Sequence, residues 1–183
     1  MSGGHGHGGH GDGDKRIGLA ISILAMCLAV SEIMGQKAQT LTLQSNIEAS
    51  NLWSFFQAKT IRRTIVETAA DEMETTLGTV KDPATEKVLK DRIEKWRTTG
   101  KRYRSEPDTG EGTEELAKRA KVAEVTRDRA GKKHVRFEFA SGAFQIAIVL
   151  ASAAVITGLT ALLWGACGLG GIGILLLISG LLG

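Results

Sequence analysis

The sequence predicts an all-α protein with three transmembrane helices and, between the first and the second, an extramembrane antiparallel helical hairpin that forms a coiled-coil-like stalk. Charged residues make up 23% of the 183-residue chain, yet they are almost all confined to its middle. The segments on either side are apolar over lengths that suit a bilayer core, which needs about 20 mostly apolar helical residues. The middle segment spaces its apolar residues with a helical period and shows no strand-like alternation.

The first apolar segment, residues 17–34, is predicted to be transmembrane helix 1. It carries no charge until Glu32, near its end, where a long side chain can reach the headgroup region. A cleavable secretory signal peptide is the competing interpretation. Lys15 and Arg16 precede the apolar run, and residues 29–31 have the small-residue pattern of a cleavage site.

Residues 1–16 are predicted to be a disordered tail rich in glycine and histidine. Three of its side chains are weak candidates for binding Ni, Cu or Zn ions: His5, His7 and His10. The glycines between them leave no preformed site, so binding would have to order a flexible segment. We therefore expect no metal centre and no cofactor, and we keep metal handling by this tail as an alternative function.

Residues 35–138 are predicted to form the extramembrane stalk. One apolar stripe at helical spacing marks its first helix and is expected to be buried: Ala58, Ile61, Ile65, Ala69 and Met73. Gly78 is expected to end this helix, since glycine favours the left-handed position after a C-terminus. The stripe is narrow and rich in alanine, so a lone hairpin buries little apolar area. Self-association is the expected remedy.

The returning half of the stalk is predicted to consist of two helices. Asp82 and Pro83 suit the N-cap and the first helical position of the second helix. Residues 107–112 have the composition of a loop. Thr113 is expected to cap the third helix, and Gly131 is expected to be a weak point within it.

An aromatic cluster at residues 53–56 lies near the predicted foot of the stalk. One interpretation makes it a packing site for a partner helix or a second copy of the chain. The favoured interpretation is packing on the chain's own returning helix, against Val135, Phe137 and Phe139. Aromatic residues at helical spacing usually belong to a core.

The uncharged C-terminal segment is predicted to hold transmembrane helix 2 at residues 139–157 and transmembrane helix 3 at residues 161–182. Its many glycines favour close approach of helices. Small residues four positions apart make Gly165 and Gly170 candidates for packing faces. Membrane lipid is therefore an expected partner.

Two stretches, "IEASNLWSFFQAKTIRRT" and "FQIAIVLASAAVIT", resemble the bacterial membrane family catalogued as domain of unknown function number 4337. The resemblance covers about Ile17 to Gly183 and implies an uncleaved first span, without implying an activity. Residues 158–163 are uncharged, whereas relatives tend to carry basic residues there. Basic residues also precede both the first and the second predicted span, so the side of the membrane that holds the stalk stays open.

No pattern in the chain predicts catalysis. His134 has no nucleophile or acid tied to it by a recognisable motif, and the net charge of +3 is too dispersed to indicate nucleic-acid binding. We expect a non-enzymatic structural or accessory protein of the bacterial inner membrane that assembles with itself or with a larger membrane complex. The alternative is a small homo-oligomeric channel or transporter component. The candidate assembly residues are Asn51, Trp53, Phe56, Gln57, Lys59, Gln145, Gly165 and Gly170.

Overall fold

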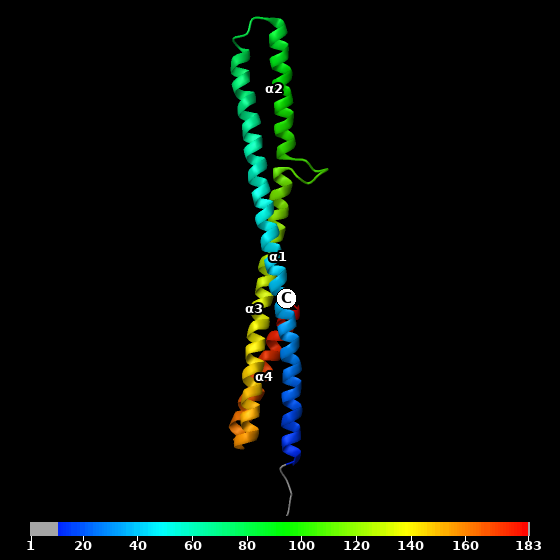
Figure 1. Cartoon of the computed structure of the whole chain (residues 1–183), viewed down its shortest axis with the longest axis vertical. Coiled ribbons are helices and arrows are strands. Elements are labelled where there is room, and N and C mark those ends of the chain that lie inside the picture. The colour runs from blue at the N-terminus through cyan, green and yellow to red at the C-terminus, as the bar shows by residue number, and fades with distance from the viewer. Residues whose placement is uncertain (1–10, 183) are drawn as a thin grey trace, which may run out of the picture. The chain divides into compact units, whose positions relative to one another are not determined.

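The computed structural model describes residues 11–182, which form four helices and contain no strand (Figure 1). Their bounds are α1 (Gly11–Leu77), α2 (Pro83–Arg104), α3 (Thr113–Thr157) and α4 (Thr160–Leu182). The all-α prediction is therefore confirmed. The predicted boundaries between residues 34 and 35 and between residues 138 and 139 fall inside α1 and α3, which pass them without a break.

The helix ends follow the sequence signals in part. Asp82 is the N-cap of α2, where its carboxylate accepts a hydrogen bond from the backbone N–H of Thr85 at 3.0 Å, and Pro83 follows as the first helical residue. The hydroxyl of Thr85 and then its backbone N–H stabilise the Asp82 carboxylate, so the pKa of Asp82 is lowered. α1 ends at Leu77, next to Gly78, as expected. The left-handed position predicted for Gly78 is wrong, because among the described glycines only Gly110 and Gly158 have a positive φ.

The prediction that Thr113 caps α3 is wrong. Gly112 precedes the helix, and its carbonyl accepts from the backbone N–H of Leu116 at 2.9 Å. Thr113 is already helical, and its hydroxyl donates to the carbonyl oxygen of Arg104 at 3.2 Å. The expected weak point at Gly131 is also absent, because α3 continues through it. A single helical glycine costs only about 1 kcal/mol, which the turns on either side outweigh.

The described residues divide into two compact units: unit 1 comprises residues 11–42 and 128–182, and unit 2 comprises residues 43–127. In unit 1, α3 and α4 approach closely at two glycines. The ring of Phe144 lies over Gly173 and the ring of Phe137 lies over Gly180. Both glycines and both rings are buried. The two contacts are seven residues apart on each helix, which is two turns of a closely packed pair.

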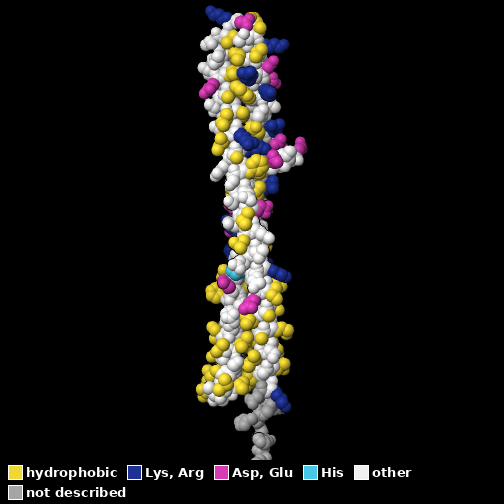
Figure 2. Space-filling model, viewed as in Figure 1, with side chains coloured by type: hydrophobic (Ala, Val, Ile, Leu, Met, Phe, Trp, Pro, Cys, Tyr) yellow, Lys and Arg dark blue, Asp and Glu magenta, His cyan; other side chains and the backbone are white. Residues whose placement is uncertain are grey.

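Helix α1 joins the same packing within unit 1. The hydroxyl of Ser31, which is buried, donates to the carbonyl oxygen of Phe137 at 2.9 Å. A side chain of α1, Leu24, lies against Gly170 of α4. Helices α1, α3 and α4 are each long and apolar enough to cross a membrane. Figure 2 shows hydrophobic side chains covering the visible face of these apolar segments, whereas charged side chains gather over unit 2.

In unit 2, one set of contacts joins α1 to α2. Ile93 and Gly100 are the buried residues of α2, and Gly100 lies against Val66 and Glu67 of α1. Arg97 of α2 forms ion pairs with Asp71 and with Glu74, the latter at 3.0 Å. The core of the unit lies earlier along α1, where Leu52 packs against α3 at Leu116 and Ala120.

The predicted apolar stripe of α1 is not its buried face. Ile61 and Ile65 are each 61% exposed, whereas Leu52, Lys59 and Ala70 are buried. The buried positions repeat every three and four residues, so Leu52 and Lys59 stand seven apart on one side of the helix. The buried face could not be predicted from apolar residues alone. Close approach of helices selects small residues such as alanine, and Lys59 is buried because it reaches ionic partners.

Candidate functional site

The aromatic cluster belongs to the core of unit 2. Trp53 and Phe56 pack against Leu116 and Ala120 of α3, and their rings meet edge to face with centroids 5.3 Å apart. The indole Nε1 of Trp53 donates to Glu124 Oε1 at 2.9 Å. Packing on the chain's own returning helix, the favoured interpretation, therefore describes these two side chains.

The predicted partners of the cluster were wrong. Phe139 and Val135 are exposed, and Phe137 packs within unit 1 against Gly180 and Gly35. The physical reason is the register in which α1 contacts α3. Trp53 faces Glu124, and Phe137 lies further along α3, where its contacts come from an earlier part of α1.

Lys59 is the buried charge of unit 2, with a side chain only 7% exposed. Its Nζ lies 3.4 Å from Glu106 Oε2 and 3.4 Å from Glu111 Oε2. It also lies 5.5 Å from the centroid of the Phe55 ring and 5.8 Å from that of Tyr103. A buried ammonium group is stable only with such partners, because burial removes its hydration. Lys59 thus attaches the segment between α2 and α3 to α1.

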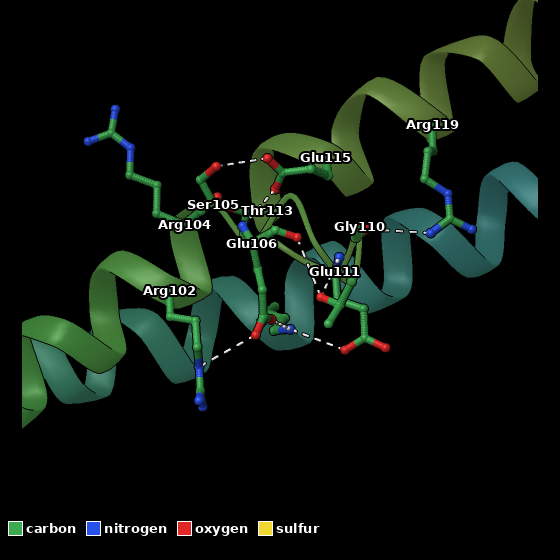
Figure 3. A network of polar contacts seen from close by, with 11 residues as sticks. Arg102, Arg104, Ser105, Glu106, Gly110, Glu111, Thr113, Glu115 and Arg119 are labelled. Carbon is green, nitrogen blue, oxygen red and sulfur yellow. Dashed lines mark hydrogen bonds and ion pairs between the residues drawn. The ribbon is translucent and has the colours of Figure 1, made fainter.

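That segment, Ser105 to Gly112, is called the connecting loop here, and its own contacts are extensive (Figure 3). The carboxylate of Glu115 accepts from Ser105 Oγ at 2.8 Å and from the backbone N–H of Glu106 at 3.2 Å. The hydrogen bond from Ser105 is the main reason that the pKa of Glu115 is lowered. Figure 3 shows the side chains of Glu106 and Glu111 converging on the same point of α1.

Gly112 is required by the way the connecting loop folds back on α3. A Cβ atom there would lie 2.1 Å from Glu115 Oε2 and 2.5 Å from the backbone nitrogen of Glu106. Both atoms take part in the hydrogen bond that holds the loop, so neither can move without breaking it. Gly110 supplies the left-handed turn, with φ of 66°.

A cavity of about 440 Å³ lies beside the connecting loop in unit 2. Its charged lining residues are two arginines and two glutamates: Arg63, Arg104, Glu67 and Glu114. Arg104 Nε pairs with Glu114 Oε1 at 3.0 Å, and Arg63 donates to the Thr113 hydroxyl at 3.4 Å. Among the described residues, no group of three or more His, Cys, Asp or Glu side chains has metal-binding geometry. The arrangement is one of mutually neutralised charges, which suits holding helices together.

The remaining predicted assembly residues do not join this cluster. Asn51 and Gln57 are exposed on α1. In unit 1, Gln145 Nε2 lies 3.4 Å from Glu32 Oε1. Gly165 is exposed on α4, and Gly170 is buried against Leu24 of the same chain. The metal candidates His5, His7 and His10 lie outside the described residues.

Sequence reasoning missed the acidic partners of Lys59. Glu106 and Glu111 lie in a loop that composition alone marked as a connection. A signal was nevertheless present, because Lys59 stands seven residues after Leu52 and seven before Val66, two apolar residues on the same side of the helix. A lysine at such a position is expected to need carboxylate partners.

Comparison with known proteins adds one finding. No curated protein and no solved structure matches the chain. The sequence model of one family, described as "Domain of unknown function (DUF4337)", matches residues 13–183. The match takes in all of α3 and α4 and nearly all of α1, together with the connecting loop that Lys59 holds. The chain therefore belongs to the DUF4337 family.

Proposed function

We propose that the protein is a non-enzymatic subunit of the bacterial inner membrane that assembles with itself or with a larger membrane complex. The apolar segments of α1, α3 and α4 serve as its transmembrane spans. The helices of unit 2 serve as an antiparallel, coiled-coil-like stalk outside the bilayer. The chain's contribution is to hold and position other subunits.

Support for a membrane location comes from side chains in unit 1. Large apolar residues on all three helices are exposed: Leu19, Met26, Phe139, Val149, Ile156, Leu175 and Leu182. Soluble monomers rarely expose a continuous apolar area of this kind, because water disfavours it. In a bilayer the same side chains meet lipid chains, and the helices associate through small residues such as Gly173.

Support for a stalk comes from the contacts of unit 2. Lys59 pairs with Glu106, and Glu74 pairs with Arg97. Residue numbers therefore rise along α1 while those of its partners fall, as in an antiparallel arrangement. Buried positions that repeat at an average of 3.5 residues are typical of helices that wind around each other. The interruption between α2 and α3 is bridged by the connecting loop.

The observation that carries assembly is an uncovered apolar face on α1 in unit 2. Ile47 is 60% exposed, and Ile61 and Ile65 are each 61% exposed. A shallow groove of about 500 Å³ follows this face from Thr60 to Glu72. Trp53, Phe56 and Lys59 are already used inside the chain, so this face is the part of α1 available to a partner helix. Burying such a side chain stabilises a complex by roughly 1.5–3 kcal/mol.

Two changes on this face test the proposal. We expect the protein, extracted in mild detergent, to have a mass that is a multiple of 19.5 kDa or that includes other subunits. Ile61→Gln with Ile65→Gln should release single chains, because the polar amides oppose burial. Val88→Gln on α2, at a valine that is 59% exposed, is the matched control and should leave the assembly intact. Mass photometry distinguishes these states, and a wild-type protein that is a lone chain contradicts the proposal.

A further inference from the structure

A polar groove in unit 1 lies where both of its long helices change from charged to apolar sequence. In α1, Glu32 directly follows the uncharged run of residues 17–31. In α3, Glu138 directly precedes an uncharged segment. Both side chains line one cavity of about 350 Å³. The lining also includes Gln36, Gln39, His134, Phe137 and Gln145.

The lining is rich in hydrogen-bond acceptors and carries no lysine or arginine. Two carboxylates and three glutamine side chains contribute oxygen atoms. The carboxylate of Glu138 is 70% exposed, so a ligand can reach it. The amide of Gln145 donates to Glu32 Oε1 at 3.4 Å, which leaves the second oxygen of Glu32 available. An uncharged or cationic donor is the chemistry that fits this groove.

His134 supplies an independent indication of the same chemistry. Its Nδ1 lies 3.1 Å from the carbonyl oxygen of Gly35. A carbonyl only accepts, so Nδ1 carries a hydrogen, and in the neutral form of the ring Nε2 is then an acceptor. Nε2 lies 3.8 Å from Glu138 Oε2, which is also an acceptor. With the neutral ring, two acceptors face each other, and a donor placed between them satisfies both.

We propose that this groove binds the primary ammonium headgroup of a membrane phospholipid. An ammonium of this type has three N–H donors, which can be shared among His134 Nε2, Glu138 and Glu32. A headgroup reaches the groove without leaving the interface, because the apolar segments of α1 and α3 begin at its edge. The inference rests on the membrane location proposed above.

Headgroups with other chemistry fit less well. A choline headgroup has no N–H to donate, and its usual protein site is a cage of several aromatic rings. The only aromatic residue of this lining is Phe137, whose side chain is buried against α4. A glycerol headgroup leaves the lipid with net negative charge, which the two carboxylates repel. The groove is therefore expected to select the ammonium headgroup over both.

The test is native mass spectrometry of the full chain from mixed vesicles of dioleoyl phosphatidylethanolamine, phosphatidylcholine and phosphatidylglycerol in equal amounts. We expect the ethanolamine lipid to be retained roughly tenfold over the other two, which corresponds to about 1.4 kcal/mol. Glu32→Gln with Glu138→Gln should abolish the preference. Glu94→Gln, at an exposed glutamate of α2 in unit 2, is the matched control and should keep it.

Equal retention of the three lipids by the wild-type protein overturns the inference, whatever the variants do. The spectra also report how many chains each particle contains, so the two proposals fail separately. Lone chains with a clear ethanolamine preference contradict assembly and support the groove. Intact assemblies without a preference contradict the groove and support assembly. A protein that alkaline carbonate releases from membranes contradicts both proposals.

Discussion

Replacing Gly173 with alanine tests the packing of unit 1 at its tightest point. A Cβ atom at this position would lie 2.7, 2.9 and 3.0 Å from three carbon atoms of the Phe144 ring. Phe144 is 0% exposed, so the surrounding atoms leave no space into which its ring could move. Forcing a methyl group into such a core costs about 1–3 kcal/mol. Alanine also favours a helix over glycine by about 0.5–1 kcal/mol, which acts in the opposite direction.

Gly171→Ala is the matched control, because no atom lies within 4 Å of the Cβ built at Gly171. Both variants gain the same helix propensity, so the difference between them isolates the packing cost. We expect Gly173→Ala to lower the free energy of unfolding by about 1–3 kcal/mol relative to Gly171→Ala. Reversible denaturation of the protein in detergent micelles, followed by circular dichroism, measures this difference.

Replacing Phe144 with a smaller side chain should remove the steric clash with the Cβ atom that Gly173→Ala adds. In a Phe144→Leu background, the cost of Gly173→Ala is expected to fall toward that of Gly171→Ala, since the ring edge is gone. A difference between the two alanine variants below about 0.5 kcal/mol, the usual error of additivity, refutes the close approach of α3 and α4 at this point.

The other predictions concern unit 2 and conduction. Lys59→Ala should lower the stability of unit 2 by about 1–3 kcal/mol, since Glu106 and Glu111 lose a shared partner. A lower midpoint of denaturation, followed by tryptophan fluorescence, reports this loss, and an unchanged midpoint contradicts it. Because the pKa of Glu115 is lowered in the fold from its ordinary 4.5, its contribution is present above pH 4.5 and disappears as pH falls below that value. The stability gap between wild type and Glu115→Gln, measured by thermal unfolding, should therefore narrow on acidification, and a constant gap refutes the assignment. Purified protein in liposomes is expected to pass no ions, and a flux that Glu32→Gln abolishes favours a channel instead.

The helices of this protein are largely readable from sequence. Apolar length identified the segments that can cross a membrane. Local chemistry placed the start of α2 at Asp82 and Pro83. These signals act within a few residues of one another, so they survive without knowledge of what the helix packs against.

The faces of the helices were not readable in the same way. Ile61 and Ile65 appeared to form a core stripe, but the chain buries Lys59 and Ala70 instead. Close approach favours small residues, and a charged side chain can be buried if its partners come from a distant loop. The position of Lys59 predicts carboxylate partners, but no local pattern says which ones, so Glu106 could not be assigned before the fold was known.

The most direct test of the central claim is the mass of the protein in particles cut from its native membrane by a copolymer, without detergent. Assembly predicts particles that hold several 19.5 kDa chains, or one such chain with other subunits in fixed proportion. Ile61→Gln with Ile65→Gln should then reduce those particles to single chains. Wild-type particles that hold one chain and no other protein contradict the account.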